Sequence, residues 1–178
     1  MNDGRMTNPH DSGRWGCGKP KRSREVDLDS LMTIGWREWV GLPDLSIRSI
    51  KAKIDTGARS SCLHAFDIEP FMRDGCQWVR FDVHPIQRND RIVRRCEAPV
   101  FDRRHVRSSN GLTSERFVIQ TTLMLIGQRV PIELTLANRD AMGFRMLIGR
   151  EAMRGRFLVD SGRSYFGGRP VRKAKRKP

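Results

Sequence analysis

The sequence has no apolar run that approaches the roughly 20 residues of a membrane-spanning helix. Its first stretch, residues 1–30, carries charges but lacks the apolar core of a signal peptide. Only four cysteines are present, without a Cys-x-x-Cys pair. These absences argue against membrane insertion, export and a disulfide framework. They predict a cytoplasmic chain whose cysteines are free thiols.

Two further absences concern cofactors. The chain has no His-Glu-x-x-His motif, and its four histidines stand far apart. Only the fold could bring Cys62, His64, Cys76 and Cys96 together as metal ligands. A Gly-x-x-x-x-Gly-Lys-Ser/Thr phosphate loop is also missing. We therefore expect no metal and no other cofactor.

Acidic residues are outnumbered: 34 Lys and Arg stand against 20 Asp and Glu, which gives a formal net charge of +14. Such a charge attracts polyanions over a long range and does so less at high salt. A length of 178 residues suits one domain with tails. We expect a disordered leader at 1–30, a single domain at 31–168 and a basic tail at 169–178.

Several alternating segments predict a mostly β fold. Residues 46–54, 77–84, 117–125 and 130–136 place apolar side chains at every second position. Asn-Gly within 103–117 predicts a hairpin. A short strand at Phe157–Val159 is also predicted, and it could supply a contact between subunits.

The motif at the centre of the chain is Ile50–Ser61, a strand that delivers Asp55 into a Thr56-Gly57 turn. A carboxylate at a strand end, followed by a hydroxyl and a glycine, is typical of an aspartic-protease half-site. We expect the Thr56 hydroxyl to bond within the turn and Gly57 to admit another backbone closely. The alternative is a turn aspartate without chemistry.

Context separates Asp55 from two similar triplets, Asp11-Ser-Gly and Asp160-Ser-Gly. Only Asp55 follows an alternating strand and is matched by a distant apolar run ending in glycine, Met146–Gly149, before a short helix. In these features the chain resembles the retropepsin-like aspartic peptidases. That resemblance implies a closed β-barrel forming half of an acid protease, with one short helix. Because one chain offers one half-site, a second Asp55 from a homodimer partner is expected.

The resemblance extends to a bacterial family often labelled "ATP-dependent zinc protease" and called RimB-like, over about residues 33–166. It implies that Asp55 is catalytic, with Thr56 and Gly57 shaping its turn. It also implies trimming of glutamate tails on a ribosomal protein. Cys62 departs from the family pattern, where a smaller residue is more usual. The matching blocks are Ile34–Pro43, Ile50–Arg59, Arg107–Gly111, Pro131–Thr135, Asn138–Asp140 and Leu147–Glu151.

Candidate substrate-binding residues come from the segments around the catalytic turn. His64 has an alternative role as a packed strand histidine, and the 103–117 hairpin is either a flap over the substrate or a plain surface hairpin. The predicted set is Ala58, Arg59, His64, Arg107, Asn110, Gly111, Ile148 and Gly149.

Two other functions remain open at this point. Basic residues at Arg59, Arg103, Arg104 and Arg107 suit a glutamate-rich peptide, but they also suit nucleic acid. The chain could thus be a non-catalytic basic β-barrel that binds RNA or acidic peptides. Its aromatic residues are few, and we expect no stacking motif on adjacent strands, which makes nucleic acid the secondary partner.

Overall fold

The computed structural model describes residues 28–107, 113–138 and 143–170, which are mostly strands with one short helix. The strands are β1 (Met32–Gly35), β2 (Arg37–Leu42), β3 (Ile47–Asp55), β4 (Ser61–His64), β5 (Phe66–Arg73), β6 (Cys76–Val83), β7 (Arg94–Pro99), β8 (Asp102–Arg107), β9 (Thr113–Leu125), β10 (Gln128–Ala137), β11 (Met146–Gly149) and β12 (Phe157–Asp160). The helix is α1 (Arg150–Met153), and two 3-10 turns are η1 (Leu28–Ser30) and η2 (Pro43–Leu45).

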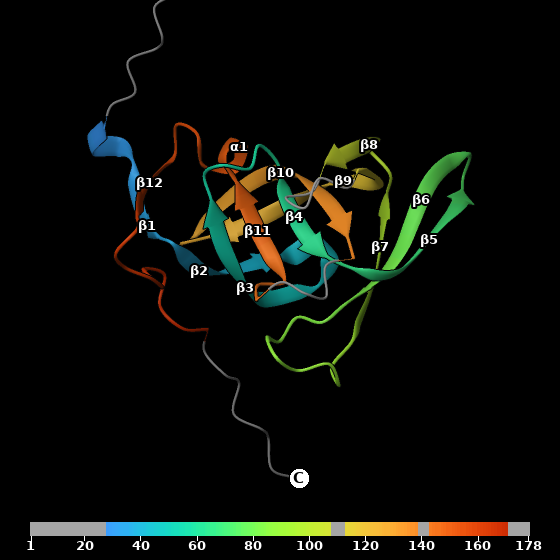
Figure 1. Cartoon of the computed structure of the whole chain (residues 1–178), viewed down its shortest axis with the longest axis horizontal. Coiled ribbons are helices and arrows are strands. Elements are labelled where there is room, and N and C mark those ends of the chain that lie inside the picture. Colours follow the sequence, from blue (N-terminus) through green and yellow to red (C-terminus); the bar gives the residue numbers. More distant parts are fainter. Residues whose placement is uncertain (1–27, 108–112, 139–142, 171–178) are drawn as a thin grey trace, which may run out of the picture.

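The main sheet has the strand order β10-β4-β11-β3-β2-β9-β8 (Figure 1). β9 also pairs with β10, so the first strand of this order is hydrogen-bonded to the last but one. β11 lies between β3, to which it is parallel, and β4, to which it is antiparallel. This insertion brings segments almost a hundred residues apart in the chain into direct pairing.

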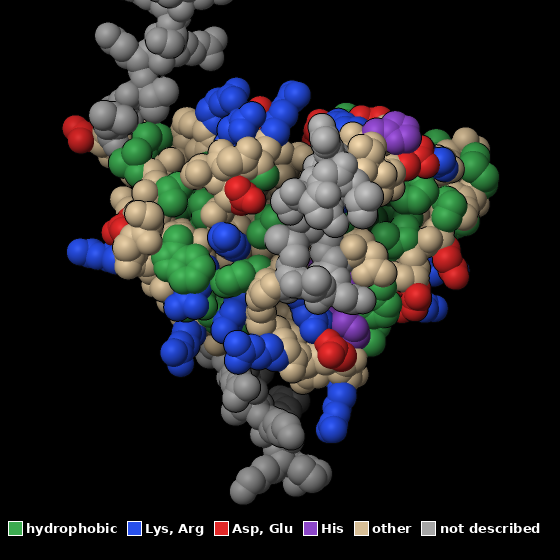
Figure 2. Space-filling model, in the orientation of Figure 1, with side chains coloured by type: hydrophobic (Ala, Val, Ile, Leu, Met, Phe, Trp, Pro, Cys, Tyr) green, Lys and Arg blue, Asp and Glu red, His purple; other side chains and the backbone are tan. Residues whose placement is uncertain are grey.

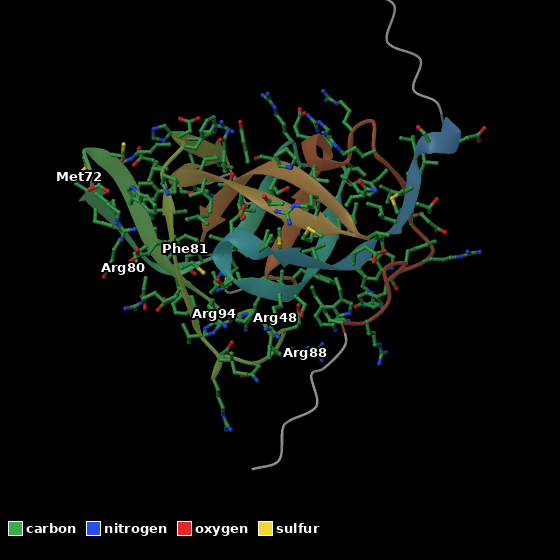
Figure 3. All side chains as sticks on the ribbon, turned by 180° about the vertical axis from the view of Figure 1, so that it is seen from behind. Arg48, Met72, Arg80, Phe81, Arg88 and Arg94 are labelled. Carbon is green, nitrogen blue, oxygen red and sulfur yellow. The ribbon has the colours of Figure 1, made fainter. Side chains whose placement is uncertain are left out.

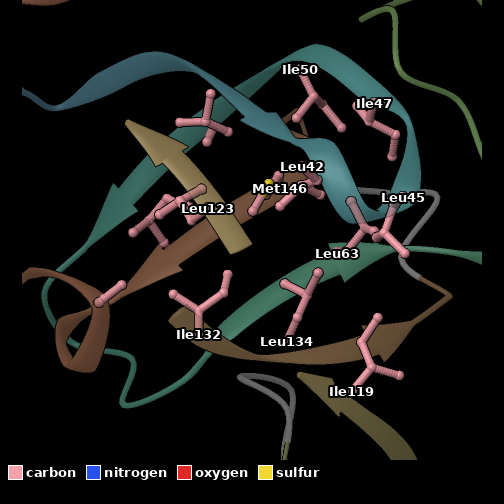
Figure 4. Close-up of a cluster of buried hydrophobic side chains, with 14 of the residues drawn as sticks. Leu42, Leu45, Ile47, Ile50, Leu63, Ile119, Leu123, Ile132, Leu134 and Met146 are labelled. Carbon is pink, nitrogen blue, oxygen red and sulfur yellow. The ribbon is translucent and has the colours of Figure 1, made fainter. Parts of the chain in front are cut away.

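The core lies on one face of the main sheet, where every second side chain is apolar (Figure 4). The alternation predicted for β9 and β10 is confirmed, because Leu123, Leu125, Val130 and Leu134 are all buried. Each fully buried Leu or Ile contributes roughly 1.5–3 kcal/mol. In β3 the same alternation buries Ile50, Ala52 and Ile54, which leaves Lys51, Lys53 and Asp55 on the outward face.

A separate sheet of β5, β6 and β7 lies at one end of the molecule (Figure 1). The sequence patterns did not predict β5, because Pro70 lies within it and its apolar residues do not alternate. One face packs on the core through residues such as Phe81, while Met72 and Arg80 lie on the outlying β5–β6 hairpin (Figure 3).

Aromatic residues do meet across adjacent strands of this small sheet, which corrects the expectation from sequence. Phe71 on β5 is opposite Trp78 on β6, with ring centroids 6.5 Å apart. Arg73 lies over both rings, and both it and Arg80 form ion pairs with Glu97. The rings are thus covered by cations that already have an acidic partner.

Glu38 fixes the segment after β12 against β2. Its side chain is fully buried and accepts hydrogen bonds from the backbone N–H groups of Gly35 (2.7 Å) and Phe166 (2.9 Å). Tyr165 is thereby placed beside Trp39 of β2, with ring centroids 6.3 Å apart. A buried carboxylate needs such partners, because an unpaired one is costly to bury.

Several predicted features fall at or beyond the limits of this structure. Residues 1–27 of the predicted leader and 171–178 of the predicted tail lie outside the described residues, whereas residues 28–30 form η1. Among the helices that the structure describes, none has the length and apolar character needed to cross a membrane.

Candidate active site

The site is built where two parallel strands end side by side. β3 ends at Asp55 and β11 ends at Gly149, and these two residues are directly paired. Asp55 is half-buried, and its side chain shares the outward face of β3 with Lys53. A carboxylate is thus held at a rigid strand end with one side open.

The turn after Asp55 is closed by the carboxylate itself. Asp55 Oδ1 accepts hydrogen bonds from the backbone N–H groups of Gly57 and Ala58, both at 3.1 Å. Within the described part of the chain, Oδ2 accepts none and the exposed Thr56 hydroxyl makes none. The turn is therefore fixed by Asp55 and not, as expected from sequence, by Thr56.

Close backbone contact occurs at Gly149 and not at Gly57. A Cβ atom on Gly149 would lie 2.5 Å from the carbonyl carbon and oxygen of Ser60 and 2.6 Å from the carbonyl oxygen of Arg59. A Cβ on Gly57 would meet only Asp55 Oδ1, at an ordinary 3.4 Å. The apolar run Met146–Gly149 therefore needs glycine at its end, because the turn after Asp55 crosses directly over Gly149.

Arg150 ties the turn to α1, a role that the candidate list from sequence did not include. Its backbone N–H donates to Ala58 O at 2.9 Å and its Nη1 donates to Gly57 O at 3.0 Å. The Glu151 N–H donates to Arg59 O at 3.1 Å. The only sequence signal for Arg150 was its place directly after the apolar run and glycine.

The other predicted substrate-binding residues are spread over different environments. Arg59 is exposed, with an ion pair to Glu151 at 3.5 Å. His64 is buried in β4 and stacks on Phe66, and Ile148 is fully buried in the core, so neither side chain lies on the open surface beside Asp55. Arg107 ends β8, whereas Asn110 and Gly111 lie outside the described residues.

The predicted hairpin before β10 is confirmed by the antiparallel pairing of β8 with β9. Its base is less positive than the sequence implied. Arg104 binds Asp102 at 2.6 Å and Glu133 at 2.5 Å. Arg103 lies 3.9 Å from Glu115. The Arg104 guanidinium, followed by the Arg103 backbone N–H, holds the pKa of Asp102 below its ordinary value.

A cavity of about 560 Å³ lies next to the segment that follows the Asp55 turn. Arg59, Ser61, Arg104 and Glu133 are among the residues that line it, and Asp55 is not one of them. The Asp55 carboxylate therefore lies outside this cavity.

The thiols and histidines do not form a metal centre in the described part of the chain. Nowhere among those residues do three or more His, Cys, Asp or Glu side chains gather closely enough to hold an ion. Cys62 and Cys96 are buried and Cys76 is exposed. Burial raises the pKa of Cys96 to about 11, which disfavours the thiolate that binds metals. The His, Cys, Asp and Glu residues that the structure describes therefore do not fit a zinc site.

Asp160 reproduces the local turn of Asp55 in another setting. Its Oδ1 accepts a hydrogen bond from the Gly162 N–H at 2.8 Å, and its Oδ2 lies 3.6 Å from Arg163 Nε. Its strand, β12, pairs with β1 in a separate two-stranded sheet. Asp11 lies outside the described residues.

Comparisons with known proteins agree with this geometry. The sequence profile of a family described as "RimB-like: Retropepsin-like aspartic endopeptidase RimB" matches residues 33–170. A Shewanella pealeana protein named "Probable alpha-L-glutamate ligase" is 49% identical over 137 residues, 77% of this chain and 30% of that protein. A protein with the same name from Parasynechococcus marenigrum is 52% identical over 132 residues, 74% of this chain and 28% of that protein.

The match thus spans less than a third of the length of these curated relatives. Among solved structures, a Legionella pneumophila protein of unknown function superposes with a TM-score of 0.62 at 25% identity. That superposition covers 76% of this chain and 98% of the other chain.

Proposed function

The chain belongs to the RimB-like family of retropepsin-like aspartic endopeptidases, and from this premise we propose that it is an aspartic peptidase in which Asp55 activates water. The observation that carries the proposal is the junction of β3 and β11. There Asp55 is opposite Gly149, and its Oδ1 is fixed by two backbone N–H groups while Oδ2 accepts no hydrogen bond from a described residue. Such an arrangement preorganises one carboxylate oxygen for chemistry.

The reaction needs two carboxylates that share one proton, because like charges at close range do not both ionise. The ionised carboxylate removes a proton from water while the water oxygen attacks the amide carbon. The protonated carboxylate gives its proton to the amide oxygen. The tetrahedral intermediate then collapses, the C–N bond breaks, and the leaving amine takes a proton from a carboxyl group.

The second carboxylate in this proposal is Asp55 of a two-fold-related copy of the chain. Asp160 is poorly suited to that part, because its carboxylate is engaged by Arg163 and lies on a separate sheet. The pairing of β9 with β10 supports the closed β-barrel of a retropepsin half. The β8–β9 hairpin is the candidate flap, since β9 belongs to the same sheet as β3.

We propose an acidic, glutamate-rich peptide as the substrate, cut at a peptide or isopeptide amide bond in the cytoplasm. The net charge of +14 supports this, and so does the relatives' name, which refers to glutamate ligation. The resemblance of the sequence to its family supports a more specific proposal, that the substrate is a glutamate tail on a ribosomal protein.

The test uses a peptide with an oligoglutamate tail, with mass spectrometry to follow loss of residues. Asp55→Asn should reduce the cleavage rate by at least about 10³-fold, because the amide cannot act as general base. Its folding should be unchanged, since Asn retains an acceptor oxygen for Gly57 and Ala58. Asp160→Asn is the matched control: it removes an acid from the same kind of turn and should cleave normally.

Cleavage by Asp55→Asn at the wild-type rate would refute the proposal. A chain that cleaves nothing but binds RNA in a salt-sensitive way, equally well with Asn at position 55, would instead support the non-catalytic RNA-binding alternative.

A further inference from the structure

The outward face of β2 and β3 carries three cations next to Asp55. Lys53 precedes Asp55 by two residues on the same face of β3, a distance of about 6.6 Å along the strand. Arg37 of β2 is directly opposite Lys53, and Trp39 is opposite Lys51. We name Arg37, Lys51 and Lys53 the β2–β3 cation row. Along β3, Lys53 is the residue closest to Asp55 whose side chain lies on the same face of the strand.

The β2–β3 cation row has no acidic partner among the described residues. Several cations elsewhere in the molecule are paired: Arg95, for example, binds Asp82 at 2.9 Å. Glu38 lies between Arg37 and Trp39 in sequence, but it points inward to backbone N–H groups. The row therefore places uncompensated positive charge beside Asp55, where it acts on a substrate at the reacting end of the strand.

Aromatic rings hold two of these cations in place. The Arg37 guanidinium carbon lies 4.4 Å from the ring centroid of Trp36 and 5.0 Å from that of Tyr165. Lys51 Nζ lies 5.2 Å from the ring centroid of Trp39. Figure 2 shows Lys and Arg side chains gathered around a hydrophobic patch on the face where β3 lies in front. Such contacts reduce the side-chain freedom that binding must remove.

The same contacts decide between two anionic ligands. Single-stranded nucleic acid is bound by stacking its bases on open aromatic faces. Here the chain's own cations already cover the rings of Trp36, Trp39 and Tyr165. The N–H donors of this face bind carboxylates as well as phosphates, so it is the occupied ring faces that favour an acidic peptide.

The row is bounded on its other side by apolar residues. Lys53 is paired with Leu147 of β11, and Leu147 is paired with Cys62 of β4. Leu147 and Cys62 belong to a small buried cluster with Ala137. Apolar side chains thus bound the row on the β11 side.

We propose that Arg37, Lys51 and Lys53 form a carboxylate-binding subsite for acidic side chains of the substrate next to the bond cut at Asp55. This inference rests on the proposed peptidase function and names the residues that select its substrate. On an extended acidic peptide, alternate side chains are about 6.6 Å apart, the spacing of Lys51 and Lys53 along β3. A run of glutamates can therefore engage both lysines at once.

The first test measures binding in the Asp55→Asn background, where no substrate is consumed. Fluorescence anisotropy compares a labelled oligoglutamate peptide with an oligoglutamine peptide of equal length. Lys53→Gln should weaken oligoglutamate binding at least about tenfold, the effect of one charge-assisted hydrogen bond, and should leave oligoglutamine binding unchanged. Lys53 is exposed, so the substitution should not disturb folding.

Arg48→Gln is the matched control. It removes one positive charge from the exposed surface of the same strand, about 20 Å from Asp55 along β3. Figure 3 shows Arg48 near Arg94 on the opposite side of the molecule from the view of Figure 1. This variant should change oligoglutamate binding less than twofold.

Equal effects of Lys53→Gln and Arg48→Gln on oligoglutamate binding would overturn the subsite. The subsite would also be overturned if an oligouridine RNA bound more tightly than oligoglutamate and Lys53→Gln abolished that RNA binding. The face would then bind nucleic acid.

Cleavage assays separate this inference from the function on which it rests. If wild-type protein cuts both peptides with equal kcat/KM and Lys53→Gln alters neither, the subsite is refuted while the peptidase stands. If wild-type protein cuts neither peptide, the peptidase proposal fails, and the anisotropy result still decides whether the row binds carboxylates.

Discussion

Single residues in this protein have roles that their local sequence does not reveal. Asp55 and Asp160 both accept a hydrogen bond from the N–H two residues later, at 3.1 Å and 2.8 Å. Both are paired with the glycine of a parallel strand, Asp55 with Gly149 and Asp160 with Gly35, but of the two only Asp160 has an arginine at its carboxylate among the described residues. The chemistry open to each aspartate therefore depends on the charges that the fold places beside it.

Gly149 gives a direct test of the crossing at the site. Gly149→Ala should reduce the free energy of unfolding by about 2–4 kcal/mol, because its Cβ would overlap backbone atoms that have no room to move. Urea denaturation measures the loss. Gly143→Ala, where a Cβ would meet nothing within 4 Å, is the control and should be nearly neutral. Equal stability of the two variants would contradict the crossing.

The cysteines should differ sharply in reactivity. Burial raises the pKa of Cys96 to about 11, so that at pH 8 about one thiol in a thousand is ionised. Cys76 is exposed. Alkylation of the native protein at pH 8, mapped by mass spectrometry of peptides, should modify Cys76 at least about 100-fold faster than Cys96. Comparable rates would show that β7 opens readily.

At the scale of elements, short connections hold the sheet in register. Asp44 in η2 accepts a hydrogen bond from the Thr122 N–H of β9 at 2.7 Å, so a turn between β2 and β3 is tied to a strand far along the chain. This contact, followed by bonds from the Thr122 and Thr121 hydroxyls, lowers the pKa of Asp44 from its ordinary 3.8.

A lowered pKa means that the ionised Asp44 stabilises the folded state above pH 3.8 and that this contribution is lost as the pH falls through the lowered value. Asp44→Asn should therefore reduce the free energy of unfolding by roughly 0.5–1 kcal/mol at pH 7, a value kept small because Asp44 is exposed to solvent. The difference from wild type should shrink in acid.

Urea denaturation at pH 7 and pH 2.5 measures this dependence. Asp74→Asn, in the exposed β5–β6 turn and without a hydrogen bond or ion pair to any described residue, is the control. An Asp44→Asn effect that is independent of pH would show that the charge of Asp44 makes no contribution.

For the whole molecule, the main proposal is that two chains share one active site. Mixing wild-type chain with a ninefold excess of Asp55→Asn chain tests it, because one wild-type chain in ten then finds a wild-type partner. After subunit exchange, about 10% of the wild-type activity should remain.

The same mixture assayed before exchange should retain full activity, which controls for simple inhibition by the added protein. Undiminished activity after complete exchange would mean that one chain suffices, and the shared-site mechanism would be wrong.

The sequence by itself determined the alternating strands, the hairpins, the motif at Asp55 and the excess of positive charge, because these follow from local periodicity and composition. It did not predict β5, since Pro70 and the charged residues around it mask a strand that its neighbour β6 holds in place.

Only the tertiary structure decided that Asp160 but not Asp55 has an arginine partner among the described residues, that Gly149 has no room for a side chain, and that the β2–β3 cation row lacks an acidic partner there. Arg104 is neutralised by Glu133 from β10, while Lys53 has only Arg37 and Leu147 opposite it. These partners come from the order of strands in the sheet. That order joins distant parts of the chain, so no local pattern of residues can encode it.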